Sequence, residues 1–266
     1  MEAYEELVAR LAGLGSAALG YSGGVDSTLL ARALGDALGE RALLLLADVP
    51  MLPRSELARA RELARLIGVP LQVLQLNPLN MAEVAENGPE RCYHCKRMLF
   101  STLRAEADRR SIPYLLDGSN RDDAGEVRPG RRALAELGVL SPLAHLTKQQ
   151  IREMSRYLGL PTADKPALAC LATRIPTGEV LTAEKLARVE RAEDFLAGMG
   201  YYGGRVRAHG ELARVELPRA ARDRLGADPE GMDRLAAGLQ AAGFRFTALD
   251  LMGYRTGSMN GGERNG

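Results

Sequence analysis

The sequence predicts an α/β fold with a parallel sheet, followed by a smaller α+β domain. In the first half of the chain, apolar strand patterns alternate with helical patterns, which is typical of successive βαβ units. The run ALLLLADV at 42–49 is apolar throughout, as expected for a strand covered on both faces. After Leu181 the predicted order becomes α-β-β-α-β, which indicates a second, smaller core.

The elements of the first half follow from hydrophobic patterning and from helix-end signals. Pro53 suits the first turn of one helix, and Gly68 suits its end. The stretch 120–146 lacks a clear pattern, and Thr147 is expected to cap the helix that follows it. The predicted helices cover 2–13, 26–38, 54–67 and 93–109, and the predicted strands cover 16–22, 42–49, 71–76 and 114–119.

The chain is expected to divide into four parts. Residues 1–165 form the parallel-sheet domain. The stretch 161–180 carries three prolines and no periodicity, so 166–180 are expected to form a long loop that carries functional residues. Residues 181–257 form the small α+β domain, and 258–266 form a disordered tail.

Composition and charge exclude several classes of protein. The 266 residues are 46% hydrophobic and 26% charged, which is ordinary for a chain with a sizeable core. The net charge is +1, so no basic field favours nucleic acid as a partner. No apolar run reaches the roughly 18 residues of a membrane span, and the acidic N-terminal stretch lacks the pattern of a signal peptide. We therefore expect a cytoplasmic protein without a membrane partner.

A glycine loop follows the first predicted strand, in the stretch GYSGGVDST. Such a loop before a helix presents backbone N–H groups and the positive end of the helix to an anion, and phosphate is the usual guest. The loop lacks the G-K-[ST] of the Walker A motif and the spacing of G-x-G-x-x-G. An ordinary strand–helix turn with Ser27 as a helix cap is the alternative.

The form S-G-G-x-D-S is similar to the loop of the PP-loop ATP pyrophosphatases. This resemblance implies a Rossmann-like sheet of the adenine nucleotide alpha hydrolase type, which binds ATP and Mg²⁺. In that family the loop holds the pyrophosphate that leaves when ATP adenylates a substrate oxygen. The residues that would bind phosphate here, directly or through Mg²⁺, are Ser22, Gly23, Gly24, Asp26, Ser27 and Thr28.

Two further strand ends point to the same nucleotide. Asp48 lies in LADVP, at the end of the second strand, where sheets of this type bind adenosine. The segment DGSNRDD ends the fourth strand, and there Ser119 and Asn120 would approach the nucleotide while Asp122 or Asp123 would hold Mg²⁺. The alternative is that these residues only form a turn.

The three cysteines are Cys92, Cys95 and Cys170. Cys92 and Cys95 form a C-x-x-C pair at a helix start, where the helix dipole and neighbouring cations favour thiolate. Cys170 lies in the proline-rich loop. An odd count argues against a disulfide framework, and the residues alone leave open a redox pair, half a zinc site or inert thiols.

A more specific resemblance covers almost the whole chain. The motifs RCYHCK, DGSNRDD, KPALACLATRIPTGE, RVRAHGELARVEL and GYRTGSMNGG follow the glycine loop in order. Together they resemble the sulfur transferases that mature the nickel-pincer cofactor of lactate racemase. The resemblance implies that ATP adenylates the carboxylates of a pyridinium dicarboxylate mononucleotide and that sulfur then replaces the activated oxygen, which gives a thiocarboxylate.

That family uses two sources of sulfur. In one, the cysteine that matches Cys170 gives up its own sulfur and becomes dehydroalanine. In the other, three cysteines matching Cys92, Cys95 and Cys170 hold a [4Fe–4S] cluster whose fourth iron carries a sulfide. All three are present here, so we favour the cluster over the sacrificial route and over zinc. The histidines His94, His145 and His209 are expected to be ordinary hydrogen-bonding residues.

Cationic residues near Cys170 and in the small domain suit an anionic substrate. Cys170 and Arg174, with Asp26, are the residues expected to carry the chemistry, and Lys165 precedes Cys170. The residues expected to bind substrate are Lys165, Arg174, Arg205, Arg207 and Arg214. The resemblance also implies a homo-oligomer and a metal at acidic residues, here Glu193 and Glu216. The alternative is that all these charges are solvated.

Three other functions use parts of the same pattern. A tRNA thiolase shares the loop and a similar cysteine set, but the near-neutral charge disfavours it. An amide-forming ligase similar to NAD or GMP synthetase would not need the cysteines. A non-catalytic nucleotide-binding protein would leave them unexplained, so we expect a sulfur transferase with a small-molecule substrate and a sulfide donor.

Overall fold

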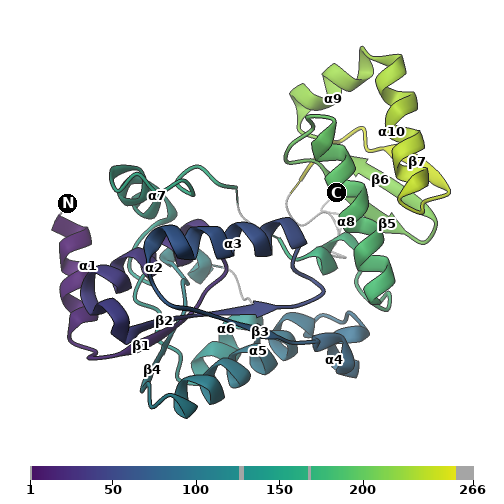
Figure 1. Ribbon diagram of the computed structural model, residues 1–266. Helices are drawn as coiled ribbons and strands as arrows, with labels where there is room; N and C mark the ends of the chain where they lie inside the picture. The colour runs from purple at the N-terminus through teal and green to yellow at the C-terminus, as the bar shows by residue number, and fades with distance from the viewer. Residues whose placement is uncertain (1, 126–128, 167–168, 256–266) are drawn as a thin grey trace. The chain divides into compact units, whose positions relative to one another are not determined.

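The computed structural model describes residues 2–125, 129–166 and 169–255 (Figure 1). The chain forms two compact units, and each is described by itself. The first unit contains Met1–Pro78 and Glu90–Leu168, and the second contains Leu79–Pro89 and Ala169–Gly266. The segment Leu79–Pro89, which the sequence analysis assigned to the first domain, thus belongs to the second unit. The expected tail at 258–266 lies outside the described residues.

The first unit is built on the predicted parallel sheet. Its four strands have the order β3-β2-β1-β4, and all their pairings are parallel. The strands are β1 (Ala17–Gly20), β2 (Ala42–Asp48), β3 (Leu71–Gln75) and β4 (Tyr114–Leu116). The register aligns Leu19 of β1 with Leu44 of β2 and with Leu116 of β4. The α/β fold class predicted from the sequence is confirmed.

Two buried layers explain why β2 is apolar throughout. Leu44 and Leu46 face a large core formed with α1, α2, α3 and α7, whereas Leu43 and Leu45 face a smaller core formed with α5. Both faces of the strand are therefore covered, as its sequence predicted. The helices are α1 (Glu2–Ala12), α2 (Val25–Leu38), α3 (Arg54–Ile67), α5 (Arg91–Arg109), α6 (Pro129–Glu136) and α7 (Lys148–Tyr157).

The structure differs from the predicted elements mainly after β4. That strand ends at Leu116, and the stretch expected to be irregular contains a 3₁₀ turn at Arg121–Gly125 and the short helix α6. Thr147 caps α7 as predicted, because its side chain accepts from Gln150 N and the Gln150 side chain accepts from Thr147 N. The remaining 3₁₀ turns of the unit are Gly39–Arg41 and Pro78–Asn80, the latter ending in the second unit.

The second unit has a three-stranded sheet of order β5-β6-β7. Strand β5 (Arg205–His209) is antiparallel to β6 (Leu212–Glu216), and β7 (Phe246–Leu249) is parallel to β6. Two short helices of this unit were not predicted from the sequence, at Ala82–Ala85 and at Arg219–Gly226, the latter between β6 and β7. The helices are α4 (Ala82–Ala85), α8 (Ala183–Gly198), α9 (Arg219–Gly226) and α10 (Pro229–Ala241), with a 3₁₀ turn at Leu171–Arg174.

In the part of the chain that the structure describes, no helix has both the length and the apolar character needed to span a membrane.

Candidate active site

The glycine loop joins β1 to α2 through a conformation that requires glycine. Gly23 has a φ of +68°, and a Cβ at this position would lie 2.7 Å from the Cβ of Ala60. Both the backbone and the close approach of α3 therefore exclude a side chain here. Gly24 is the N-cap of α2 and has no side chain to cap it, so the first N–H groups of this helix face the loop.

The two serines of the loop are linked to each other. Ser22 Oγ and Ser27 Oγ lie 3.1 Å apart, and Ser27 Oγ donates to the carbonyl oxygen of Gly24 at 3.3 Å. The Gly24 N–H donates weakly to Ser22 Oγ at 3.4 Å. Hydroxyl and amide groups thus surround the start of α2, where the positive end of the helix favours an anion.

Asp26 is the point at which three segments of the first unit meet. Lys148 Nζ is paired with Asp26 Oδ2, and Asn120 Nδ2 donates to Asp26 Oδ1 at 3.3 Å. Lys148 is the first residue of α7, and its backbone N–H donates to Asp122 Oδ2 at 2.8 Å. The structure therefore brings Asp26 and Asn120 together and adds a cation to them.

The segment after β4 closes on the glycine loop. A Cβ at Gly118 would lie 3.1 Å from the backbone nitrogen of Ser27, so the two loops touch through glycine. Asp117 is 5% exposed and accepts from Ser119 Oγ and, at 2.5 Å, from Ser141 Oγ. Asp123 Oδ2 accepts from the Asn120 N–H at 3.1 Å. Asn120 and Asp123 therefore shape this turn as well as flanking the loop.

A cavity of about 350 Å³ lies at the carboxyl ends of β1, β2 and β4. The strand order reverses beside β1, so this is the position at which open parallel sheets bind ligands. Its volume is in the range of ordinary small-molecule sites. The polar part of its wall includes Ser22, Asp26, Ser27, Asp117, Ser119 and Asp123, and the apolar part includes Leu46, Val49, Leu52, Leu99, Phe100 and Leu103.

Lys96 adds a cationic side chain to the wall of the same cavity. Its stem passes beside Gly130 of α6, where a Cβ would lie 2.7 Å from Lys96 Cδ. Tyr21 also lines the cavity, and burial raises the pKa of its phenol to about 12, so this side chain is neutral at ordinary pH. Asp48, which the sequence predicts to bind the nucleotide, is paired with Arg54, and its neighbours Ala47 and Val49 line the cavity.

Lys165 contacts the backbone of the glycine loop. Its Nζ donates to the carbonyl oxygen of Gly23 at 3.0 Å and to Glu56 Oε2 at 2.5 Å, and its side chain is 9% exposed. Arg152 of α7 holds the same segment through the carbonyl oxygen of Lys165 at 2.8 Å. The structure therefore places Lys165, expected to bind substrate, against the backbone of the glycine loop.

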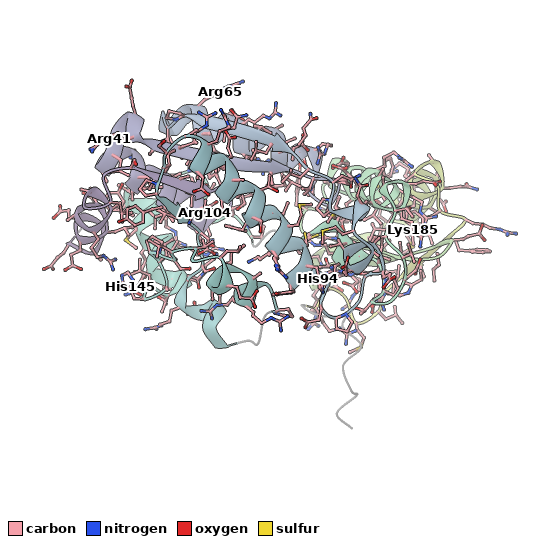
Figure 2. All side chains as sticks on the ribbon, turned by 90° about the horizontal axis from the view of Figure 1, so that it is seen from below. Arg41, Arg65, His94, Arg104, His145 and Lys185 are labelled. Carbon is pink, nitrogen blue, oxygen red and sulfur yellow. The ribbon has the colours of Figure 1, made fainter. Side chains whose placement is uncertain are left out.

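Cys92 and Cys95 lie in the first turns of α5, three residues apart on one face of the helix. Figure 2 shows His94 near the start of this helix and Arg104 farther along it. Cys92 is exposed and Cys95 is half-buried, and the Arg91 guanidinium donates to Cys92 Sγ at 3.4 Å. Tyr93, between the cysteines, is fixed by a 2.7 Å hydrogen bond to Glu136 and by the Arg132 guanidinium, 4.0 Å from its ring centroid.

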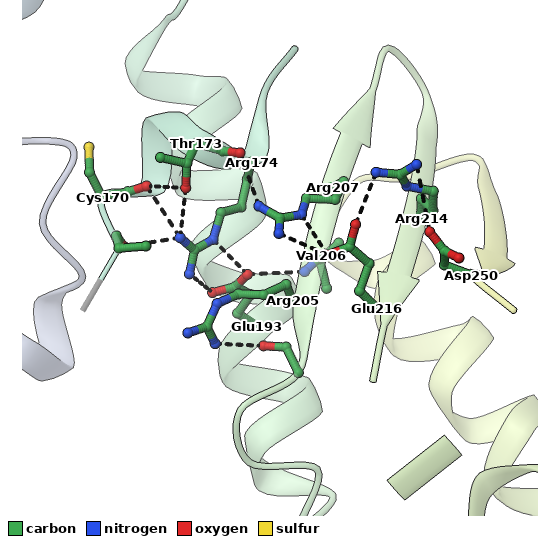
Figure 3. Close-up of polar contacts among 12 residues, drawn as sticks. Cys170, Thr173, Arg174, Glu193, Arg205, Val206, Arg207, Arg214, Glu216 and Asp250 are labelled. Carbon is green, nitrogen blue, oxygen red and sulfur yellow. Dashed lines mark hydrogen bonds and ion pairs between the residues drawn. The ribbon is translucent and has the colours of Figure 1, made fainter. Parts of the chain in front are cut away.

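Cys170 belongs to the second unit and immediately precedes a 3₁₀ turn. Its side chain is exposed, and its carbonyl oxygen accepts from Thr173 N at 2.9 Å and from Arg174 at 3.2 Å. Arg174 is only 3% exposed and forms a two-bond ion pair with Glu193, both bonds being 2.9 Å (Figure 3). The cysteine is thus exposed on a segment that a buried ion pair holds to α8.

A second buried ion pair joins the two strands predicted to bind substrate. Arg207 donates twice to Glu216 Oε2, at 2.9 and 2.8 Å, and Arg214 donates to Glu216 Oε1 at 3.0 Å (Figure 3). Arg207 also donates to the carbonyl oxygen of Thr173 at 3.0 Å. Burial, and then the charge of Arg174, lowers the pKa of Arg205. Arg174 and Arg207 therefore contact the Cys170 turn, and Arg205 and Arg214 continue the cluster along β5 and β6.

The two carboxylates expected to bind metal are engaged with this cluster. Glu193 also accepts from the Val206 N–H at 3.0 Å, and Glu216 is fully buried between two arginines. Among the described residues, no three His, Cys, Asp or Glu side chains form a group that could hold a metal ion. The metal role of Glu193 and Glu216 stays a prediction.

Sequence reasoning missed Lys148 as a site residue and did not assign Lys96 to the cavity. A signal for Lys148 was present, because a lysine in the first turn of a helix opposes the helix dipole and needs another reason to be there. Lys96 follows Cys95 directly, so its position on the helix was predictable, but its contact with Gly130 depends on tertiary packing.

The fold and the glycine loop define an ATP-binding protein of the PP-loop ATP pyrophosphatase superfamily. No protein-family model matches the chain. It is 35% identical, over 257 residues, to the pyridinium-3,5-bisthiocarboxylic acid mononucleotide synthase of Lactiplantibacillus plantarum, and the match covers 96% of this chain and 92% of that protein. The chain belongs to the family of this synthase.

Two other relatives are similar to most of this chain. An uncharacterized protein of Synechocystis sp. is 42% identical over 249 residues, which is 93% of this chain and 92% of that protein. A component of the glutamine-hydrolyzing GMP synthase of Methanosphaerula palustris is 29% identical over 248 residues, which is 79% of each chain. The match to a GMP synthase supports the superfamily, and the match to the mononucleotide synthase supports the narrower family.

Proposed function

We propose that this protein is an ATP-dependent sulfur transferase that acts on the carboxylates of pyridinium-3,5-dicarboxylate mononucleotide. The observation that carries the proposal is the cavity at the glycine loop, in a chain that belongs to the mononucleotide synthase family. The relative from L. plantarum is named for the bisthiocarboxylic product. The residues around the cavity support the first half of the reaction, and the cysteines support the second.

The first step is adenylation. The glycine loop binds the β- and γ-phosphates of ATP through the N–H groups at the start of α2 and the hydroxyls of Ser22 and Ser27. A substrate carboxylate oxygen attacks the α-phosphorus, the bond to the bridging oxygen breaks, and pyrophosphate leaves with its electron pair. Fixed N–H donors and a lysine stabilise the charge that develops on the leaving group.

Mg²⁺ fits the acidic side of this cavity. Asp26 and Asp123 both line it, and carboxylate oxygens are the ligands that Mg²⁺ prefers. The ion would neutralise the phosphates during adenylation. Lys148, now paired with Asp26, would then contact a phosphate oxygen when the carboxylate turns to the ion. Ser119 and Asn120 would hold the nucleotide from the β4 side.

The second step replaces the activated oxygen with sulfur. We assign this step to the segment that carries Cys170, supported by its exposed side chain and by the cationic residues around it. In the sacrificial route, Cys170 Sγ attacks the acyl adenylate and AMP leaves. Loss of the Cα proton then breaks the Cβ–S bond, which gives the thiocarboxylate and dehydroalanine. No oxidant or reductant is needed.

The alternative source of sulfur is a [4Fe–4S] cluster on Cys92, Cys95 and Cys170. The chemistry of the donors fits, because iron–sulfur clusters bind thiolates and Arg91 donates to Cys92 Sγ. When bound, such a cluster would supply an iron with an open position for a sulfide. This route is preferred in the proposal because it explains all three cysteines. It requires a sulfide donor as a partner.

The arginine cluster of the second unit is proposed to bind the anionic substrate. Arg205, Arg207 and Arg214 lie on β5 and β6, and Arg174 lies beside Cys170. Guanidinium groups bind phosphate and carboxylate through paired donors. The paired donors of Arg174 and Arg207 already bind Glu193 and Glu216, so the half-buried Arg205 and Arg214 are the members proposed to contact the substrate directly. A homo-oligomer and a cytoplasmic location complete the proposal.

Release of pyrophosphate tests the proposal. The full-length protein is incubated with Mg²⁺ and ATP, and with pyridinium-3,5-dicarboxylate mononucleotide, bulk tRNA, or xanthosine monophosphate with ammonium. We expect pyrophosphate only with the pyridinium mononucleotide, and loss of release in Asp26→Asn. Cys170→Ser should still release pyrophosphate but form no thiocarboxylate. Release that requires tRNA or ammonium would overturn the proposal.

A further inference from the structure

Asn87 has a buried and unusual backbone position. It lies in the segment Leu79–Pro89. This segment interrupts the first unit along the chain but belongs to the second unit. Its side chain is fully buried, and its φ is +56°, in the left-handed region where asparagine is tolerated better than most residues. A polar side chain with no exposed surface, held in this conformation, needs specific partners.

Those partners come from the segment that follows Cys170. Asn87 Nδ2 donates to the carbonyl oxygen of Pro176 at 2.8 Å and, more weakly, to that of Ile175 at 3.4 Å. The backbone nitrogen of Gly178 donates to the carbonyl oxygen of Asn87 at 2.9 Å. The side chain and backbone of Asn87 therefore bind three residues of the segment that follows Cys170.

Neighbouring contacts extend this junction. Leu181 N donates to the carbonyl oxygen of Ala85 at 2.7 Å, and Asn87 N donates to that of Val84 at 3.2 Å. Val84 is fully buried and Leu181 is 2% exposed, so apolar packing surrounds the hydrogen bonds. Because water is excluded, an unpaired amide here would cost considerably more than it would at the surface.

The junction lies five residues from a cysteine along each of the two segments that form it. Cys92 follows Asn87 by five residues, and Cys170 precedes Ile175 by five. Between Cys170 and Ile175 the chain is a 3₁₀ turn in which Thr173 N donates to the Cys170 carbonyl oxygen at 2.9 Å. Between Asn87 and Cys92 stand Gly88, Pro89, the N-cap Glu90 and Arg91, which is the first residue of α5.

We propose that Asn87 is a positioning residue that holds the two cysteine-bearing segments to a common anchor. The inference rests on the proposed function, which gives Cys92, Cys95 and Cys170 a shared role. The hydrogen bonds of Asn87 described above join it to backbone atoms of Ile175, Pro176 and Gly178, so the role proposed for it is positional and not catalytic. With both segments anchored at Asn87, only the few residues that lead to Cys92 and to Cys170 remain to be ordered when the three thiolates bind a common group, which lowers the cost in chain entropy.

The substitutions Asn87→Gly and Asn87→Asp separate the contribution of the side-chain amide from that of the backbone conformation. Glycine adopts a positive φ freely, so Asn87→Gly removes only the side-chain hydrogen bonds. Asn87→Asp keeps the shape but turns a carboxylate oxygen toward two carbonyl oxygens, which should open the junction. Glu86→Gln, at the exposed neighbouring residue, is the matched control.

The readout is cross-linking of the reduced, chelator-treated full chain with dibromobimane, which bridges two nearby thiols. Peptide mass spectrometry identifies bridges from Cys170 to Cys92 or Cys95. We expect these bridges in the wild type and in Glu86→Gln, and a rate about tenfold lower in Asn87→Asp, with Asn87→Gly between them. The bridge between Cys92 and Cys95, both on α5, should form at the same rate in every variant and reports that the first unit is folded.

Two outcomes would separate the two claims. If the wild type forms no bridge to Cys170, the three-cysteine site of the proposed function fails. If the wild type forms the bridge and both Asn87 variants form it equally fast, the anchor proposed for Asn87 is wrong. Iron bound after anaerobic reconstitution should fall in parallel with the bridging rate, and unchanged iron content in Asn87→Asp would also contradict the anchor.

Discussion

Lys165 donates a 3.0 Å hydrogen bond to the carbonyl oxygen of Gly23, so this lysine supports the loop that is expected to bind phosphate. Glu56 holds the ammonium in place at 2.5 Å, and the side chain is nearly buried. The contact fixes the direction of the Gly23 peptide. That peptide sits at the bend of the loop, where φ is +68°.

Lys165→Met should weaken phosphate binding while leaving the fold intact. Without the ammonium, the Gly23 carbonyl oxygen and Glu56 lose their partner, and the loop is less well fixed. We expect pyrophosphate affinity, measured by calorimetry, to fall about tenfold. Lys165→Arg should recover part of the loss. Lys185→Met, which removes a half-exposed lysine of the second unit, serves as control. Unchanged affinity in Lys165→Met would show that the contact does not shape the loop.

Lys148→Met should lower the rate of adenylation more than it lowers the affinity for ATP. The lysine is already beside Asp26, and its charge is proposed to act on the phosphate chain as pyrophosphate leaves. Removing one such stabilising group costs about two orders of magnitude in kcat. Substrate-dependent exchange of pyrophosphate into ATP gives kcat and KM separately. A change confined to KM would assign Lys148 to ground-state binding alone.

Gly23→Ala should destabilise the first unit for two reasons, the positive φ of this residue and the close approach of Ala60. Gly39→Ala separates these two contributions. Both glycines have a positive φ, but a Cβ at Gly39 meets nothing within 4 Å, whereas one at Gly23 meets Ala60. Gly39→Ala therefore measures the backbone cost alone, about 1 kcal/mol. Gly23→Ala adds overpacking against α3, for a total of about 2–4 kcal/mol in the urea unfolding free energy. Equal values for the two variants would contradict the close approach.

Glu193→Gln should be costly, because Arg174 is buried. Loss of the carboxylate charge leaves a nearly buried guanidinium without its ion partner, which typically costs about 3–5 kcal/mol. The exposed pair Arg219 and Asp223 is the control, and Asp223→Asn should change the unfolding free energy by less than about 0.5 kcal/mol. Similar unfolding free energies for the two variants would show that burial does not decide the effect.

The free energy of unfolding should fall as the pH drops below about 6.5, the ordinary pKa of histidine. Burial first, and then the nearby cation Arg10 or Arg214, lowers the pKa of His145 and of His209. Below about pH 6.5 the unfolded chain therefore binds more protons than the folded chain. The histidines stabilise the fold above that pH, and their contribution is lost as the pH falls toward the folded pKa values.

The double variant His145→Gln, His209→Gln tests this pH dependence. Its thermal unfolding midpoint should change less between pH 7 and pH 5 than that of the wild type. Every other titratable group is the same in the two proteins, so the comparison isolates the two imidazoles. Identical slopes in the two proteins would show that other groups control the pH dependence.

Local sequence patterns were sufficient to predict several elements of the fold. The apolar run of β2 and the glycines between β1 and α2 are local signals, and both predicted their place in the structure correctly. Helices α6 and α9 were missed because they are short and polar, so their patterning is weak over eight residues.

The pairings within the site depend on contacts that no local pattern contains. Arg174 meets Glu193, and Lys165 meets Gly23, across 19 and 142 residues of chain. Spacing alone identified the charged residues as candidates but could not select their partners. Asn87 illustrates the same limit, since its role appears only when Ile175 and Pro176 are seen to accept from it.

Mass spectrometry of the reaction product tests the central claim most directly. The full-length protein, reconstituted anaerobically with iron and sulfide, is incubated with Mg²⁺, ATP and pyridinium-3,5-dicarboxylate mononucleotide. We expect an ATP-dependent product in which sulfur replaces one oxygen of each carboxylate. It should form with one AMP and one pyrophosphate per replacement and should be absent in Cys170→Ser. Formation of AMP and pyrophosphate without any sulfur in the product would contradict the claim.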